Sequence, residues 1–563
     1  MRIKKFFLFY FSLLASSISL SLEHYPEEAA IASAHSLASE AGIEILKRGG
    51  NAFDAAIAVS AVLSVVEPYG SGLGGGGFFL LHRSKDNLQV MIDGREVAPI
   101  SATRDMYLDE DGNPIPRASR DGPLSSGIPG LPASLEYIAN HYGNLPLSVS
   151  LEPAIRHAEN GFPAYSTMLK LLERKINIMN EEAKRIFMPN GSIPSEGDLI
   201  IQKDLANTLK ILGEEGFSGF YRGEVAKRLV EGVNSASGIW SLDDLASYQI
   251  KEREPIIGYF QGMQVIAPPP PSSGGIGLIN MLNILSGYQI NNLDSVSRIH
   301  LIVEAMRRAY RDRAQYIGDS DFVNVPIDKL IDKHYASSQR ASININKSTP
   351  SNLLPGISPI DYSTGDQTSH FSIIDNDGNI VSATQSINFS YGSGFIPKGT
   401  GVILNNEMDD FSIKLGTPNG YELIGNEANE IAPGKRMLSS MTPTIIIDDR
   451  GLAVLGTPGG SRIITMVLLS ALAWNQGESA ESITSLPRFH HQFFPDLIQY
   501  EPDAFSDDEI KALKDKGHSL RPLNSSYGNM HVVTWDFETG DLDASSDPRG
   551  HGEPRFLESV NLE

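Results

Sequence analysis

The feature that most constrains the fold is the run of short apolar segments that begins near residue 368. Segments 371–375 and 380–386 flank Asn376-Asp377-Gly378, which is a favourable turn for a β-hairpin. A second pair, 444–447 and 453–455, flanks another turn, and segment 462–474 is then typical of a largely buried helix. Strand pairs followed by buried helices predict a layered architecture of sheets and helices.

The same order of elements occurs before residue 368. An alanine-rich helix is predicted at 51–66, with Asn51 as its cap and Pro68 just beyond its end. A glycine cluster follows at 70–77, and strands are predicted near 78–81 and 90–92. The layered architecture is therefore expected to include both parts of the chain.

Two other segments are open to more than one interpretation. Segment 295–313 predicts an amphipathic helix whose second face we expect to be mostly solvated. That face carries Arg307, Arg308, Arg311 and Asp312. Segment 267–275 contains four prolines, so it is either a linker or a rigid wall inside one domain.

Composition excludes several classes of function. The chain has 563 residues and a formal net charge of −22, which argues against nucleic acid as a partner because a phosphate backbone requires a basic surface. It has no cysteine, which excludes thiol catalysis and cysteine-ligated zinc. Length alone favours several domains.

The N-terminus resembles a secretory signal peptide. Arg2, Lys4 and Lys5 precede an apolar run at 6–14, and small residues follow at 15–17. We place the signal peptide at 1–22 and expect an exported protein, periplasmic or extracellular. The alternative is a retained membrane anchor, although the apolar run is short for a bilayer span.

Two apparent motifs have weak support. Residues 70–75 match G-x-G-x-x-G, but the dinucleotide fingerprint needs a strand before it and a helix after it, and here the order is reversed. A loop that admits a close backbone approach is the better interpretation. The adjacent His490 and His491 diverge on either a strand or a helix, so we predict structural histidines and no metal site.

The segment around Thr368 differs, because two other polar segments share its character. Segments 394–410 and 435–462 combine acids, hydroxyl groups and glycine pairs at a density that buried strands tolerate mainly when they line a site. With these, the chain resembles the γ-glutamyltransferase (γ-glutamyltranspeptidase) family of N-terminal-nucleophile hydrolases. The resemblance covers about residues 50–548 and depends on segments 50–54, 73–77, 94–99, 270–275, 368–370, 405–411, 439–443, 458–462, 487–491 and 546–549.

The resemblance implies a four-layer αββα sandwich and a precursor that cleaves itself between Gln367 and Thr368. The products would be a large subunit, 23–367, and a small subunit, 368–563, interlaced in one catalytic domain. Cleavage would free the α-amino group of Thr368, whose reference pKa is close to neutral, to act as the base for the threonine hydroxyl. No cofactor or metal is implied.

Further roles follow from matched positions. Ser386 stands where the family has a second threonine that supports the nucleophile. Gly459 and Gly460 match the backbone donors of the oxyanion hole. The donor's α-ammonium would be held by Asn388, Glu407 and Asp410, and its α-carboxylate by Arg95, Ser439 and Ser440. Segment 415–435 resembles the loop that covers the pocket in some members, with Tyr421 at its aromatic position.

The implied activity is γ-glutamyl transfer from glutathione and related amides to water, amino acids or dipeptides. One rival is an acylase of the same superfamily, although an acyl group without the ammonium would face Glu407 and Asp410 uncompensated. The other is a homologue that cannot process itself and serves as a binding or structural protein.

Overall fold

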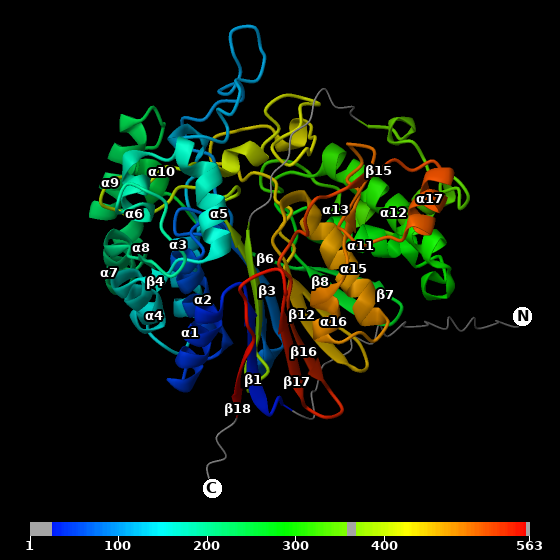
Figure 1. Ribbon diagram of the computed structural model, residues 1–563, viewed down its shortest axis with the longest axis horizontal. Helices are drawn as coiled ribbons and strands as arrows, with labels where there is room; N and C mark the ends of the chain where they lie inside the picture. Colours follow the sequence, from blue (N-terminus) through cyan, green and yellow to red (C-terminus); the bar gives the residue numbers. More distant parts are fainter. Residues whose placement is uncertain (1–24, 357–367, 559–563) are drawn as a thin grey trace, which may run out of the picture.

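The computed structural model describes residues 25–356 and 368–558. The predicted signal peptide at 1–22 and Gln367 of the predicted cleavage site lie outside these residues. In the described part of the chain, no helix is both long enough and apolar enough to cross a lipid bilayer. Two antiparallel sheets pack face to face in the centre, and helices cover the outer face of each (Figure 1).

The first sheet combines strands from both sides of residue 368. Strand β9 lies between β1 and β10, and β10 lies between β9 and β2. The strands in spatial order are β18 (Arg555–Glu558), β1 (Glu28–Ser33), β9 (Ser369–Ile374), β10 (Ile380–Ser386), β2 (Gly76–Arg83), β3 (Leu88–Gly94) and β6 (Lys251–Arg253). A cleavage before Thr368 would therefore leave the two pieces sharing one sheet.

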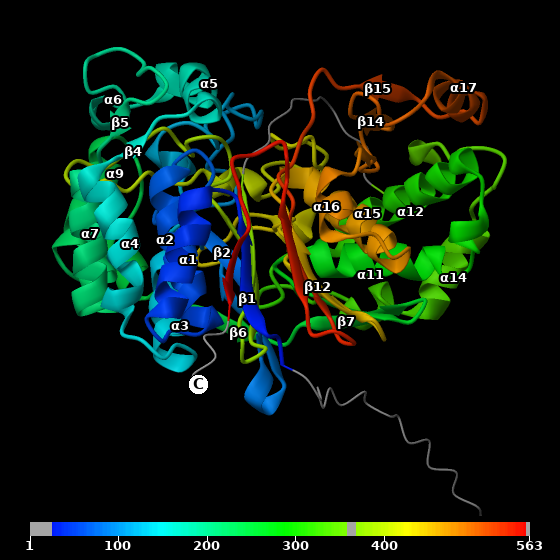
Figure 2. The same ribbon diagram turned by 60° about the horizontal axis from the view of Figure 1, so that its bottom comes forward.

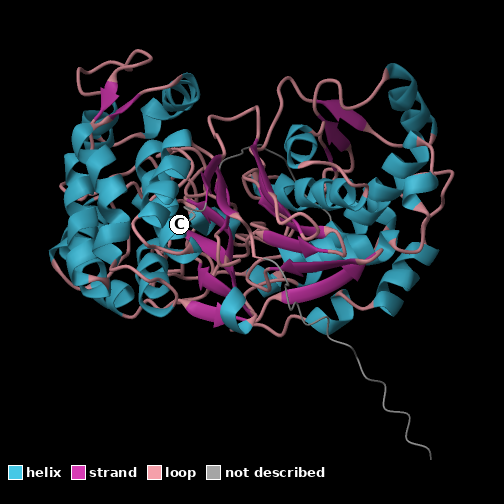
Figure 3. Cartoon of the chain, turned by 90° about the horizontal axis from the view of Figure 1, so that it is seen from below, coloured by secondary structure: helices cyan, strands magenta, loops and turns pink. Residues whose placement is uncertain are grey.

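The second sheet is shared in the same way. Its strands in spatial order are β17 (Leu542–Ser546), β16 (His531–Asp536), β12 (Gly451–Gly456), β11 (Thr444–Ile447), β8 (Met263–Ala267) and β7 (Ile256–Phe260). Both predicted hairpins are present, as β9–β10 and β11–β12. Seen from below, the strands form the middle of the molecule with helices on either side (Figure 3).

Two helical layers complete the sandwich, one against each sheet (Figure 2). On the outer side of the first sheet lie α1 (Ser36–Lys47), α2 (Ala52–Val66), α3 (Leu131–His141), α4 (Leu147–Asn160), α7 (Lys203–Glu215), α8 (Phe217–Tyr221) and α9 (Glu224–Ser235). On the outer side of the second lie α11 (Gly274–Leu285), α12 (Ser295–Tyr316), α14 (Lys333–Ala341), α15 (Ile463–Asn475) and α16 (Ala480–Ser485). The predicted αββα architecture is confirmed.

Alternation along the central strands produces one apolar and one polar face. In β9 and β10, Phe371, Ile373, Val381 and Ala383 belong to the core beneath the first helical layer. The other face carries buried polar groups, and it bonds to the second sheet: the hydroxyl of Ser382 donates to the carbonyl of Leu455 at 3.2 Å. Because side chains alternate with a period of two, Thr368 shares the polar face.

The segments that precede the central strands behave as predicted. Helix α2 has a capping box in which the Asn51 side chain accepts from the amides of Phe53 and Asp54. The glycine cluster after α2 permits close backbone contacts, because a Cβ on Gly75 would lie 2.0 Å from the carbonyl oxygen of Ser386.

The adjacent histidines have structural partners. His490 and His491 are buried and hydrogen-bonded to Thr465, Gln492 and Asp496.

The structure corrects one sequence interpretation and decides between the two alternatives of another. The polar face of α12 is not solvated: Arg307, Arg308 and Asp312 are buried. They find partners in neighbouring elements and in the helix itself, including a 2.6 Å ion pair between Arg308 and Glu304. Segment 267–275 is a buried turn between β8 and α11 rather than a linker.

Removing the cap of α2 should destabilise the folded protein. Asn51 also donates to the carbonyl of Tyr142 at 2.8 Å, so Asn51→Ala leaves buried backbone groups without their partner. We expect a loss of about 1–2 kcal/mol in the free energy of unfolding, measured by denaturant titration. The exposed Asn190→Ala is the control. Equal stability of both variants and the wild type would contradict this interpretation of the cap.

Candidate active site

Thr368 lies at the start of β9, where strand register places it beside Ser386. Ser369 pairs with Gln385, so the next position in each strand brings Thr368 and Ser386 together. Their hydroxyl oxygens are 3.4 Å apart, and the backbone amide of Asn388 donates to the Ser386 hydroxyl at 2.8 Å. Both side chains are buried. The fold thus presents two adjacent hydroxyl groups, as predicted.

A small inner pocket of about 20 Å³ opens beside Thr368. Its volume is enough for one water molecule. It gathers residues that lie far apart in the sequence, including every predicted site residue of the described chain except Gly459. The lining residues are Arg95, Thr368, Ser386, Asn388, Glu407, Asp410, Tyr421, Leu423, Ser439, Ser440, Met441, Gly460 and Ile463.

Arg95 is the electrostatic centre of the inner pocket. It is almost fully buried, at 1% exposure, and each of its terminal nitrogens contacts a different acid. Nη1 lies 2.6 Å from Glu407 Oε2, and Nη2 lies 2.6 Å from Asp410 Oδ2. The resemblance implied that the arginine and the two acids hold opposite ends of a donor. In this structure they form one ion-pair network.

Burial and neighbouring charges shift the acids of this network. Burial raises the pKa of Asp410 to about 7, against the lowering effect of Arg95, and Glu407 raises it further. Burial and Glu407 raise the pKa of Glu96, which lies 3.5 Å from Arg95 Nη1, well above its usual value.

Arg313, which no sequence pattern singled out, contacts Ser440, one of the residues that line the inner pocket. Its Nη2 donates to the hydroxyl of Ser440 at 3.4 Å, and its Nε donates to Ser273 at 3.0 Å. Asp410 is among the charges that act on its pKa, which burial lowers. The density of arginine at the end of α12 is the signal that could have identified it, because four arginines occur within residues 307–313.

Gly459 and Gly460 adopt backbone conformations that require glycine. Their φ angles are 143° and 55°, and a Cβ on Gly460 would lie 2.2 Å from the Tyr421 ring. The pair immediately precedes α15, so its amides lie at the positive end of a helix. Gly460 lines the inner pocket, whereas Gly459 faces the space on the other side of Thr368.

Tyr421 comes from the predicted covering loop and closes the inner pocket. Its hydroxyl donates to the carbonyl of Asn388 at 3.0 Å, and its carbonyl accepts from Gln492 at 3.0 Å. Its ring stacks on Phe389 with 4.6 Å between centroids. Because Tyr421 lines the inner pocket and Phe389 lines a larger cleft outside it, this stack separates the two spaces.

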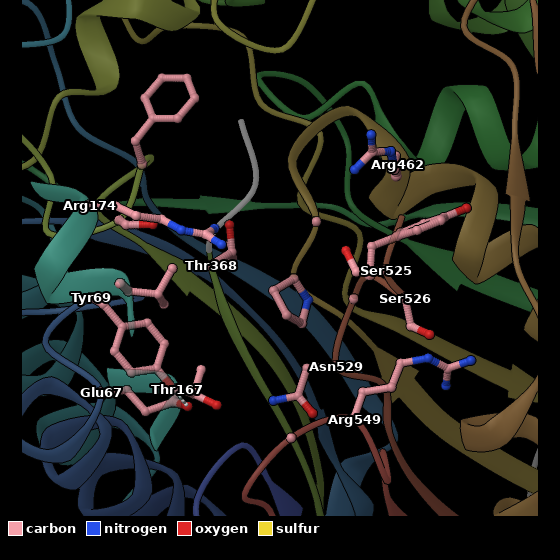
Figure 4. Close-up of a pocket in the computed structure, with 18 of the residues that line it drawn as sticks. Glu67, Tyr69, Thr167, Arg174, Thr368, Arg462, Ser525, Ser526, Asn529 and Arg549 are labelled. Atoms are coloured by element: carbon pink, nitrogen blue, oxygen red, sulfur yellow. Dashed lines mark hydrogen bonds between the residues drawn. The ribbon is translucent and has the colours of Figure 1, made fainter. Parts of the chain in front are cut away.

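The outer cleft has a volume of about 920 Å³, and Thr368 lines it as well as the inner pocket. Helix α5 (Ser166–Lys175) contributes Thr167, Arg174 and Lys175 to one wall, and segment 521–529 contributes Ser525, Ser526 and Asn529 to the other (Figure 4). Thr368 lies between these walls (Figure 4). A scissile bond positioned at Thr368 would therefore have one side in each space.

One group among the described residues has the composition of a metal site, namely His300, Glu304 and His518. Its ligand atoms already have protein partners. Nδ1 of His300 is hydrogen-bonded to Nε2 of His518 at 2.8 Å, and Glu304 is ion-paired with Arg308. We therefore assign this cluster a structural role.

Comparison with known proteins places this site in a family. The family model for Gamma-glutamyltranspeptidase matches residues 38–557. The chain is similar to a Glutathione hydrolase proenzyme of Escherichia coli, at 41% identity with 92% of this chain and 90% of the relative covered. It is also similar to the proenzyme of the same name from Bacillus subtilis, at 38% identity over 93% of this chain and 90% of the relative.

Solved structures agree on the fold. The cephalosporin acylase of Bacillus halodurans superposes with a TM-score of 0.82 at 28% identity, covering 94% of this chain and 96% of that one. The gamma-glutamyltranspeptidase of Helicobacter pylori superposes with a TM-score of 0.56 at 40% identity, over 57% of this chain and 94% of that one. With a family match over most of its length and relatives above 30% identity, the chain belongs to the gamma-glutamyltranspeptidase family.

Proposed function

We propose that the protein is a γ-glutamyltransferase and glutathione hydrolase that uses Thr368 as its nucleophile. The observation that carries the proposal is the inner pocket beside Thr368, in which Arg95 is ion-paired with both Glu407 and Asp410. The relatives named Glutathione hydrolase proenzyme, similar over about nine-tenths of the chain, support the same substrate class.

The chain would first cleave itself between Gln367 and Thr368. The hydroxyl of Thr368 attacks the carbonyl of Gln367, and hydrolysis of the resulting ester leaves subunits 23–367 and 368–563. The interlaced sheets account for the two pieces staying together, since β9 is hydrogen-bonded between β1 and β10. The freed α-amino group of Thr368 then serves as the base for its own hydroxyl.

Catalysis follows from the same hydroxyl. The Thr368 oxygen attacks the γ-carbonyl of the donor, the carbon–nitrogen bond breaks, and the amine leaves with the proton that the base took up. Water, an amino acid or a dipeptide then attacks the γ-glutamyl ester and regenerates the hydroxyl. Ser386 supports Thr368 by hydrogen bonding, and the amides of Gly459 and Gly460 stabilise the oxyanion, a contribution of about 3–4 kcal/mol for one such donor.

The charges of the inner pocket match a γ-glutamyl group. In the inner pocket Arg95 lies against both Glu407 and Asp410, so the pocket offers partners for a positive and for a negative group. A γ-glutamyl group carries one ammonium and one carboxylate on the same carbon. Glu407, Asp410 and Asn388 would hold the ammonium, while Arg95, Ser439 and Ser440 would hold the carboxylate.

The pocket must open for this ligand, because about 20 Å³ cannot hold an amino acid. The covering loop would supply the movable part, with Tyr421, whose contacts include Asn388, Gln492 and Phe389, as the residue that moves. Displacement of Tyr421 would join the inner pocket to the outer cleft. The donor would enter as the loop swings away and be enclosed as it returns.

We also propose where the protein acts and which small molecules it binds. The N-terminal sequence supports export to the periplasm or the exterior. The small-molecule partners would be glutathione, other γ-glutamyl amides, and amino acid or peptide acceptors, and the chemistry described needs neither cofactor nor metal.

An acylase is the second candidate, supported by the fold similarity to the cephalosporin acylase of Bacillus halodurans. The inner pocket disfavours it. A dicarboxylic acyl group has no ammonium, so once its carboxylate engages Arg95 it leaves Glu407 and Asp410 without a counter-charge.

Self-cleavage should require the Thr368 hydroxyl. Purified wild-type protein should give two masses that meet between Gln367 and Thr368, and Thr368→Ala should give one uncleaved mass. Thr368→Ser keeps a hydroxyl and should still split. An alanine variant that splits at the same bond would rule out Thr368 as the processing nucleophile.

Ser386→Ala should slow both processing and turnover by about tenfold, the scale of one lost hydrogen bond to a reacting group. Ser386→Thr keeps the hydroxyl and should remain active. Processing is followed by mass spectrometry and turnover by release of a γ-glutamyl anilide. If all three proteins behave alike, the Ser386 side chain only packs.

Donor specificity separates the two candidate functions. Wild type should strongly prefer a γ-glutamyl anilide over the glutaryl anilide that lacks only the amino group. Arg95→Lys should lose roughly 2–5 kcal/mol in kcat/KM for the γ-glutamyl compound, because one ammonium cannot reproduce two separate 2.6 Å ion pairs. Comparable kcat/KM for both anilides in wild type would favour the acylase.

A further inference from the structure

The outer cleft has a charge opposite to that of the whole chain. The protein carries a net charge of −22, yet among the described residues that line this cleft there is one acid and a set of seven basic side chains. The basic residues are Arg117, Arg120, Arg174, Lys175, Arg462, Arg521 and Arg549. The acid, Glu67, is buried and hydrogen-bonded to Tyr69 and Ser369.

Some of these cations are neutralised from behind. Arg549 is paired with Glu501 and Asp547, Arg521 with Glu422, and Arg120 with Asp409. Each of these acids is buried beneath the cleft surface. The acids therefore fix the guanidinium groups in place, while the surface that a ligand would meet remains basic.

The end of α5 carries the two cations that are most available. Arg174 is exposed, Lys175 is half-buried, and neither forms an ion pair with an acid within residues 25–356 or 368–558. The Arg174 side chain extends toward Thr368 (Figure 4). The ammonium of Lys175 lies 5.9 Å from the centre of the Phe389 ring, beside the stack that divides the two spaces.

The surroundings of Lys175 disfavour another positive charge. Burial lowers the pKa of Lys175 to about 8, with further lowering by Arg117 and Arg120, although Asp121 acts in the opposite direction. Arg117 itself is paired with Asp121 at 2.7 Å. A bound anion at this point would relieve the repulsion among the three cations.

The position of the cleft determines which part of a substrate meets these charges. The inner pocket encloses the acyl side of the scissile bond, and Thr368 is common to both spaces. The amine side of the bond must then lie in the outer cleft, where the leaving peptide departs. A volume of about 920 Å³ is at the upper end for ligand sites, so it admits a peptide of several residues.

We propose that the outer cleft is a binding site for the amine side of anionic γ-glutamyl peptides, those that carry several carboxylates beyond the scissile amide. Arg174 and Lys175 supply the cations of the wall formed by α5, and Arg521 with Ser525 and Ser526 lines the opposite wall. This inference rests on the proposed function and specifies its substrate class. It concerns the chemistry of the leaving peptide, whereas the inner pocket selects the acyl group.

The test compares two donors that differ only in charge. γ-Glutamyl-Glu-Glu carries two more carboxylates beyond the scissile amide than γ-glutamyl-Gln-Gln, which has almost the same shape. Wild type should hydrolyse the acidic donor with a kcat/KM about tenfold higher, the scale of two partly exposed charge contacts. Raising the ionic strength from 0.1 M to 1 M shortens the screening length from about 10 Å to about 3 Å and should largely remove the preference.

Substitutions locate the effect. The double variant Arg174→Gln/Lys175→Gln should reduce the preference to about twofold or less. Lys170→Gln, an exposed lysine on the same helix that does not line the cleft, should retain it. If the double variant is unstable, Arg174→Gln alone, at an exposed position, should still halve the preference, and the ionic-strength comparison needs no variant.

The outcomes separate this inference from the proposed function. Turnover of a γ-glutamyl anilide with equal kcat/KM for the two peptides would overturn the anionic site and leave the γ-glutamyl activity standing. A preference that is unaffected by salt and by the double variant would also overturn it. Failure to turn over any γ-glutamyl donor would refute the proposed function itself.

Discussion

The antiparallel pairing of β9 and β10 is the constraint on which the rest of the site depends. Its register fixes Thr368 opposite Ser386, and its alternation turns both hydroxyl groups away from the apolar core. Near Thr368 the face between the sheets is then polar, with His370 bonded to Thr384 and Ser372, while Ile374 and Ile380 at the hairpin end are apolar. A slip of one residue would turn Thr368 toward the helices, so the hydrogen-bond ladder that builds the sheet also positions the nucleophile.

The same arrangement explains how a buried arginine is tolerated. Desolvating Arg95 is costly, and the fold compensates with two acids at 2.6 Å and the carbonyls of Met437 and Leu438. In the unliganded pocket the opposite charges are thus paired with one another. A zwitterion can exchange one set of pairs for another without leaving a buried charge alone, which a singly charged acyl group cannot do.

Sequence patterns predicted the parts of this structure that have local causes. Hairpin turns, the Asn51 cap and strand alternation located β9, β10, β11, β12 and α2, and the family resemblance supplied the residues that line the inner pocket. The polar face of α12 was misread because helical periodicity cannot distinguish solvent from buried partners supplied by distant segments, such as Asp496 for Arg307. Arg313 was missed for the same reason, since its partners Ser273 and Ser440 come from two other elements.

The basic outer cleft has no counterpart in any one sequence motif. Its cations come from α5, from the loop before α3, from the start of α15 and from the C-terminal segment, so only the folded chain brings them together. The stack of Phe389 on Tyr421 separates the outer cleft from the inner pocket by the thickness of two rings. Thr368, which lines both the inner pocket and the outer cleft, therefore faces two electrostatic environments. Such a division allows one site to choose its acyl group and its amine by independent criteria, because neither set of charges has to satisfy both sides of the bond.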